Sequence, residues 1–235
     1  MQKNVVHDSA SALGLLLAGD PALYGIVGLS LFVSLAATVL AAVIALPLGA
    51  ALALTRFPGR AAVIVVLNAS MGLPPVVVGL VVYLLLSRSG PLGFLGILFT
   101  PQAMALAQAI LVMPIIAALT RQTVEDVWLE YRDELTAMRV APMQRVATLI
   151  WDARFSLTTA LLAGFGRAAA EVGTVIIVGG NIEGFTRVMT TTIALETSKG
   201  DLPLALGLGV VLIALIIVVN ALAWGVRRFG ELRAG

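Results

Sequence analysis

Residues 21–55 read PALYGIVGLSLFVSLAATVLAAVIALPLGAALALT and contain no charged side chain over 35 positions. A helix needs about 20 apolar residues to cross the hydrocarbon core of a bilayer. A charge at the centre of such a helix costs about 2.5 to 3.5 kcal/mol, so charge-free intervals mark candidate spans. This stretch therefore predicts a transmembrane helix over residues 24–54, kinked near Pro47.

Further charge-free intervals along the chain mark further candidate spans. Uncharged intervals lie on both sides of Arg88 and again before Arg227, and the interval 155–180 holds only Arg167 and Glu171. The pattern predicts an all-α polytopic membrane bundle of five transmembrane helices, at about 24–54, 61–87, 101–120, 155–180 and 202–226.

Prolines and polar residues refine these spans. We expect a break at Pro74–Pro75 in the second span and a bend near Pro114 in the third. Unpaired polar groups are costly in hydrocarbon, so the polar residues inside the spans are expected to form hydrogen bonds between helices. They are Ser30, Ser34, Thr38, Asn68, Ser70, Gln108, Thr158, Thr159 and Asn220.

The composition agrees with a lipid environment. Hydrophobic residues make up 60% of the chain and charged residues 12%, which inverts the balance of a soluble globular domain. The arginines are spread between apolar blocks, so no nucleic acid is expected as a partner. Without cysteine, disulfides and thiolate metal sites are excluded. His7 is expected to be a solvated tail residue, and the stretch ending at Gly19 is not expected to be a cleaved secretory signal.

Lysines and arginines set the expected orientation. With five spans, ten of them fall on one side of the membrane and four on the other, and the richer side is cytoplasmic. This places residues 1–23 outside as an N-terminal extracytoplasmic segment and residues 228–235 in the cytoplasm as a tail. Between them, residues 24–227 are expected to form the transmembrane domain.

The two longest connections carry mixed charges. In the cytoplasmic segment 121–154, apolar positions such as Val124 and Leu135 recur among charges, which favours short amphipathic helices interrupted at Pro142. Two interpretations of this segment remain open: its helices dock onto a partner protein, or they lie at the membrane interface without a partner. The outer segment 181–201, which is expected to be a loop, carries five charges, which suit contact with another protein or a solvated connection.

Arg167 and Glu171 stand four residues apart within the fourth span, so they are expected to share one helical face. An ionisable residue inside the membrane is a candidate functional residue. Two roles remain open. The pair lines or closes a translocation path, to which Thr158 and Thr159 are further candidates, or it is a mutually neutralising pair that packs the bundle.

Three blocks together resemble the membrane subunit of tungstate and molybdate ABC importers. Residues 72–93, GLPPVVVGLVVYLLLSRSGPLG, look like the family's LPPVVVG segment and GPLG turn, with Pro74, Pro75 and Gly79 as structural positions. Residues 164–209, GFGRAAAEVGTVIIVGGNIEGFTRVMTTTIALETSKGDLPLALGLG, resemble the family's region with G-R-A, E-x-G, G-N-I and G-D-L, including Gly180 and Asn181.

The third block is the cytoplasmic segment, where Glu134 aligns with the glutamate of the coupling loop shared by ABC importer permeases. The resemblance implies that residues 134–145 contact the ATPase. Two alanines and one glycine of the pattern are replaced by Leu135, Thr136 and Val140. The other positions assigned to this coupling loop are Ala137, Ala141 and Arg145.

The resemblance implies a type I ABC importer permease in a prokaryotic cytoplasmic membrane, acting as a homodimer with two ATPases and an extracytoplasmic oxyanion-binding protein. The motifs GGNI, TRVMTT and LET resemble the tungstate branch of the family more than the molybdate branch. A molybdate importer permease is the alternative function. The sequence does not decide between the two ions. No cofactor is expected in this chain, because ATP would be bound by the partner ATPase.

Energetics require such a partner. Moving a dianion inward against 100 mV costs about 4.6 kcal/mol. The chain has no G-x-x-x-x-G-K-[ST] loop to hold ATP, so we expect a transporter subunit and not an enzyme. The second function class is a secondary transporter or channel driven by an ion gradient, although no internal repeat typical of such folds is visible in the sequence. The third class is a membrane scaffold without transport activity.

Overall fold

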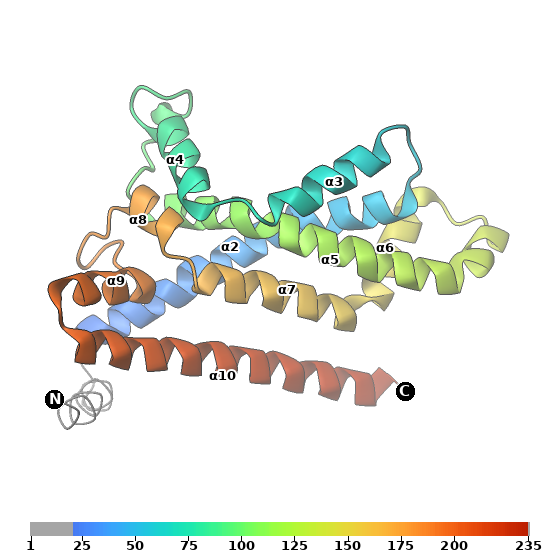
Figure 1. Cartoon of the computed structure of the whole chain (residues 1–235). Coiled ribbons are helices and arrows are strands. Elements are labelled where there is room, and N and C mark those ends of the chain that lie inside the picture. The colour runs from blue at the N-terminus through green and yellow to red at the C-terminus, as the bar shows by residue number, and fades with distance from the viewer. Residues whose placement is uncertain (1–20, 235) are drawn as a thin grey trace.

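The computed structural model describes residues 21–234, with side chains placed for residues 23–225. Within this range helices are joined by turns and short connections and no strand is present, which confirms the expected all-α class (Figure 1). The helices are α2 (Pro21–Leu54), α3 (Arg60–Ser70), α4 (Pro75–Leu86), α5 (Pro101–Ala137), α6 (Pro142–Asp152), α7 (Arg154–Ala169), α8 (Gly173–Gly179), α9 (Met189–Lys199) and α10 (Leu202–Ala234), with a short 3₁₀ turn, η1 (Gly93–Leu95). His7 and most of the expected segment 1–23 lie outside the described residues.

Among residues 21–234, three helices, α2, α5 and α10, are long and apolar enough to cross a membrane. Two bent pairs add up to two more crossings: α3 and α4 meet at 101°, and α6 and α7 at 76°. The α3–α4 bend falls where Pro74 and Pro75 were expected to break the span. Pro74 is extended at the N-cap of α4 and Pro75 opens its first turn, where proline is tolerated.

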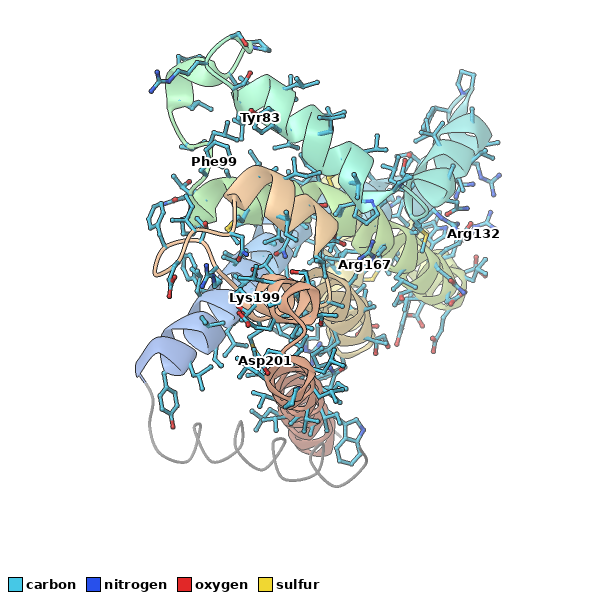
Figure 2. The ribbon with its side chains drawn as sticks, turned by 60° about the vertical axis from the view of Figure 1, so that its left-hand side comes forward. Tyr83, Phe99, Arg132, Arg167, Lys199 and Asp201 are labelled. Carbon is cyan, nitrogen blue, oxygen red and sulfur yellow. The ribbon has the colours of Figure 1, made fainter. Side chains whose placement is uncertain are left out.

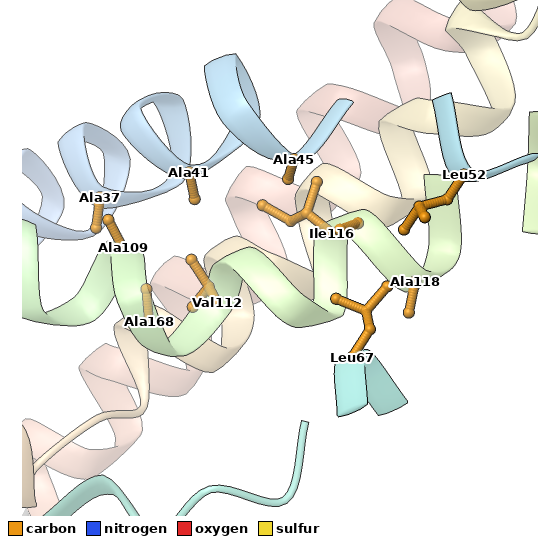
Figure 3. Close-up of a cluster of buried hydrophobic side chains, with 11 residues drawn as sticks. Ala37, Ala41, Ala45, Leu52, Leu67, Ala109, Val112, Ile116, Ala118 and Ala168 are labelled. Carbon is orange, nitrogen blue, oxygen red and sulfur yellow. The ribbon is translucent and has the colours of Figure 1, made fainter. Parts of the chain in front are cut away.

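The centre of the bundle is the contact between α2 and α5. Three alanines of α2 at a spacing of four residues, Ala37, Ala41 and Ala45, are fully buried against α5 (Figure 3). Small side chains let two helix backbones approach closely, which is how helices associate in lipid. Gly49, one turn further, continues this row: a methyl group there would lie 2.6 Å from the backbone oxygen of Ala117.

Two expectations about the connections are wrong. Residues 121–137 do not form a separate short helix; they continue α5 without interruption, because no proline or glycine stands between Arg121 and Ala137. The outer segment 181–201 is not a loop throughout, because α9 occupies Met189–Lys199. The fourth expected span is also broken: α7 ends at Ala169 and α8 begins at Gly173.

The molecule has two distinct ends in Figure 1. One end, here called the α6 end, gathers α6, the last turns of α5 and α10, and the α2–α3 turn. The opposite end, the α9 end, gathers α8, α9, the start of α2 and the turn between α4 and α5. The α3–α4 pair runs from the α6 end to the α9 end, so its bend lies near mid-length.

The polar residues of the spans were expected to bond between helices. Most of them bond within their own helix instead. The hydroxyls of Thr38, Ser70 and Thr158 each donate to the backbone oxygen four residues earlier, and the Asn220 amide does the same. This local bond satisfies the hydroxyl without a neighbour. Bonds between helices come from Ser30, which accepts from the Met189 N–H, and from Gln108.

Candidate functional site

The two breaks in the bundle, between α3 and α4 and between α7 and α8, meet in one place. The Thr174 hydroxyl, in the first turn of α8, donates to the Pro75 backbone oxygen at 2.8 Å. Gly79 of α4 packs on the same residue so closely that a methyl group would lie 2.9 Å from the Thr174 Cα. We call this meeting point, residues 71–79 with 167–174, the junction.

Glu171 holds the junction together. Its side chain is only 4% exposed, and one carboxylate oxygen accepts from Arg167 at 2.6 Å. The other oxygen accepts from the Thr174 N–H at 3.1 Å, and the Glu171 backbone oxygen accepts from the Thr190 hydroxyl. The carboxylate therefore links the last turn of α7 to the first turn of α8. It gives a partner to the Thr174 N–H, one of the first N–H groups of α8, which have no acceptor within the helix.

The ion pair expected from the sequence is present, but its setting differs. α7 ends at Ala169, so Glu171 lies beyond the helix and reaches back to Arg167. The two partners are unequally exposed: the Arg167 side chain is 35% exposed. Figure 2 shows Arg167 among the packed helices, whereas Arg132 lies at the periphery. The pair thus has a buried structural carboxylate and a partly open cation.

Thr158 and Thr159 are not brought to the junction. They precede Arg167 by nine and eight residues on the same helix, roughly 12 Å along its axis. Thr158 donates to the Arg154 backbone oxygen, and the Thr159 side chain is exposed. Thr174, which does lie at the junction, and Thr190, which donates to the Glu171 backbone oxygen, have no charge or spacing that would single them out in the sequence.

The α6 end is a second candidate site, because it is packed and not a solvated loop. Val124 of α5 and Leu149 of α6 are buried with Ala50 and Ala53 of α2 in one hydrophobic cluster. The guanidinium of Arg145 lies 5.7 Å from the centre of the Trp128 ring, and its Nε donates to the Val140 backbone oxygen at 2.7 Å. α6 is therefore fixed against the bundle.

The segment 134–145 comprises the last turn of α5, the connection 138–141 and the first turn of α6, and is here called the turn 134–145. Leu135 packs on the hydrophobic cluster, while Glu134, Thr136, Ala137 and Ala141 are exposed. The left-handed residue of this turn is Arg139, with φ of 50°, and not Val140. A β-branched residue is disfavoured at positive φ, so the turn accepts valine where the coupling-loop pattern has glycine.

Exposed apolar side chains mark this turn. Met138 is 74% exposed and Met143 is 82% exposed. Nearby, the carboxylates of Asp152 and Glu130 raise the pKa of the Tyr131 phenol, because they disfavour a further negative charge. Tyr131 lies beyond the apolar part of α5. The turn thus presents flexible apolar side chains next to negative charge, features suited to contact with another protein.

At the α9 end, Gly180 and Asn181 form a tight turn. Both have positive φ, 72° and 50°. The Thr186 hydroxyl ties the turn: it donates to the Gly179 oxygen at 2.6 Å and accepts from the Ile182 N–H. Arg187 pairs with the exposed Glu183 at 3.4 Å.

Known permeases resemble the chain over most of its length, although no protein-family model matches it. A probable anion ABC transporter permease protein of Haloferax volcanii is 44% identical over 205 residues, covering 85% of this chain and 88% of that protein. The tungstate uptake system permease protein TupB of Peptoclostridium acidaminophilum is 40% identical over 217 residues, covering 92% and 95%. TupB of Campylobacter jejuni is 38% identical over 163 residues, covering 69% and 68%. Permeases named for molybdenum and sulfate transport are more distant, at 28% identity.

Proposed function

The chain belongs to the family of ABC transporter permeases for tungstate and related anions, and from that membership we propose that it conducts tungstate inward as half of the membrane part of an ATP-driven importer. The identity to permeases named for anion and tungstate transport carries this proposal, and the junction supports a transport path. The junction brings two broken helices and a partly exposed arginine together. Discontinuous helices near mid-membrane are also typical of secondary transporters, so the junction supports transport and the relatives support the ATP-driven class.

The exposed backbone of the junction supports a path beside it. Residues 71–74, between α3 and α4, are non-helical and exposed. Hydrocarbon offers no hydrogen-bond partners, so irregular backbone at this depth is tolerated only against protein or a water-filled cavity. We propose that a second copy of the chain and an aqueous path cover it, with the Arg167 guanidinium facing the path. One partly neutralised cation attracts a dianion without trapping it.

The arrangement of cations supports the proposed orientation. Arg56 lies in the α2–α3 turn and Arg139 between α5 and α6, both at the α6 end, whereas Arg88 lies in the turn between α4 and α5 and Lys199 ends α9, both at the α9 end. The positive-inside rule assigns the α6 end to the cytoplasm. The C-terminus is then cytoplasmic and the N-terminus outside.

Partners follow from this orientation. We assign the turn 134–145, with exposed Met138 and Met143, to contact with a separate ATPase subunit that hydrolyses ATP. The α9 end, with Glu183 85% exposed and Phe185 50% exposed, is assigned to an extracytoplasmic oxyanion-binding protein. Tungstate is favoured over molybdate because relatives named for tungstate are 38–40% identical and the one named for molybdenum 28%.

A paired neutral substitution tests the path role of Arg167. Replacing Arg167 and Glu171 together with Gln removes both charges but keeps side chains that hydrogen-bond, including an acceptor for the Thr174 N–H. If Arg167 attracts the anion, tungstate uptake by vesicles containing the complete transporter should fall about tenfold, the equivalent of roughly 1.4 kcal/mol. The thermal midpoint, measured in parallel, should change by only a few degrees.

Arg121, which pairs with Glu125 four residues later in α5, provides the control. The same double change to Gln at Arg121 and Glu125 removes a partly exposed pair of equal spacing that lies outside the junction and outside both proposed contact surfaces, and uptake should stay within about twofold. Unchanged uptake in the Arg167 and Glu171 double variant would show that the pair only packs the bundle.

A further inference from the structure

We propose that one buried water molecule, bonded to Gln108, completes the hydrogen bonding where α2, α5, α7 and α9 meet. Gln108 lies in α5, is 3% exposed, and its Nε2 donates to the Ala168 backbone oxygen at 3.0 Å. The Oε1 atom of the same amide is buried and has no hydrogen-bond partner among the described residues. Buried acceptors are nearly always satisfied by protein or by ordered water.

The orientation of this amide is fixed by its partner. A carbonyl oxygen accepts and cannot donate, so the amide nitrogen has to face Ala168 and the amide oxygen has to face away from it. Exchanging the two atoms would place two acceptors against each other. The unpaired Oε1 is therefore a property of the packing.

A small cavity lies beside Gln108. Its polar wall consists of Ser30 and Ser34 from α2, Gln108, and Thr190 from α9. About 10 Å³ of it is open to the centre of a water molecule, close to the room that a single buried water occupies. Larger ligands are excluded by this volume.

The chemistry of the wall selects water over a cation. No carboxylate is among the described residues that line the cavity, and the Glu171 carboxylate is engaged by Arg167 and the Thr174 N–H. The Thr190 hydroxyl donates to the Glu171 oxygen, and the Ser30 hydroxyl donates to the Ile26 oxygen. Both hydroxyls keep acceptor capacity, so a water can donate to Gln108 Oε1 and to one of them.

The position gives this water a role beside the junction. It would join side chains of α2, α5 and α9 directly next to Ala168 and Ala169, the last residues of α7. A bridging water can exchange partners when helices shift, whereas a direct bond between side chains would break. This polar contact is therefore suited to a bundle whose broken helices move during transport.

Two substitutions at Ser34 distinguish a hydrated cavity from an empty one. Ser34→Ala removes the hydroxyl and leaves the space, whereas Ser34→Val also fills the space with methyl groups. If water is present, Ser34→Val expels a bonded molecule, and its thermal midpoint in lipid nanodiscs should lie about 2–4 °C below that of Ser34→Ala. If the cavity is dry, the added methyl groups gain contacts, and Ser34→Val should melt at or above Ser34→Ala.

Direct observation provides the second test and holds even if a variant fails to fold. In an experimental structure of the chain that resolves ordered waters, density for a water molecule should lie within hydrogen-bond distance of Gln108 Oε1. An empty cavity, or a protein group bonded to Oε1 there, would overturn the proposal.

Discussion

Glu171→Ala is expected to destabilise the folded chain by about 3 kcal/mol and to abolish transport. The substitution leaves the Arg167 guanidinium without its carboxylate inside the bundle and removes the acceptor of the Thr174 N–H. Breaking a buried pair by removing one partner costs about 3–5 kcal/mol, and the lower value applies because Arg167 is partly exposed. Thermal unfolding followed by tryptophan fluorescence measures the loss.

Glu183→Ala is the matched control for this prediction. Glu183 also pairs with an arginine four residues away, but it is 85% exposed and the ion pair spans 3.4 Å. Its removal should change stability by no more than about 0.5 kcal/mol. Equal effects of the two substitutions would mean that Glu171 does not hold the junction together.

Gly49→Ala should separate α2 from α5 and cost about 2–3 kcal/mol. The added methyl group would lie 2.6 Å from the Ala117 oxygen and 2.8 Å from the Thr120 Cβ, and the backbone oxygen cannot rotate away. Overpacking of this kind forces backbone shifts with a cost of about 1–3 kcal/mol. A lower thermal midpoint and a smaller folded yield in detergent are the expected readouts.

Gly28→Ala provides the comparison within the same helix. A methyl group at Gly28 meets no described atom within 4 Å. Alanine is the better helix former, so this change should leave stability unchanged or raise it by up to about 1 kcal/mol. If Gly49→Ala is tolerated as well as Gly28→Ala, the close α2–α5 contact is not the centre of the fold.

Charge spacing predicts much of the fold because lipid penalises charge. The uncharged run 21–55 becomes one helix ending at Leu54, and Pro74–Pro75 marks the bend of the second pair. The helix ends are harder to predict. Arg121 marks the expected edge of the apolar region, not the end of α5, and a helix continues past that point if its residues allow it.

No proline in the sequence indicates the break between α7 and α8. It depends on Glu171, which bonds groups on both sides of the break, and such bonds are visible only in three dimensions. The charge pattern found Arg167 and Glu171 because charges inside a span are rare. It could not find Thr174, because uncharged polar residues are common in membrane helices and its partner lies far away in the sequence. Gln108 was expected to bond between helices, but the sequence could not name its partner, Ala168.

Uptake into sealed liposomes tests the central claim, that this chain is the membrane subunit of an ATP-driven oxyanion importer. The chain would be reconstituted with its ATPase, with binding protein and tungstate on one side and ATP on the other. We expect tungstate to accumulate only when both the ATPase and ATP are present, and an imposed proton gradient should have no effect. Accumulation driven by a proton gradient in liposomes that hold this chain alone would contradict the account.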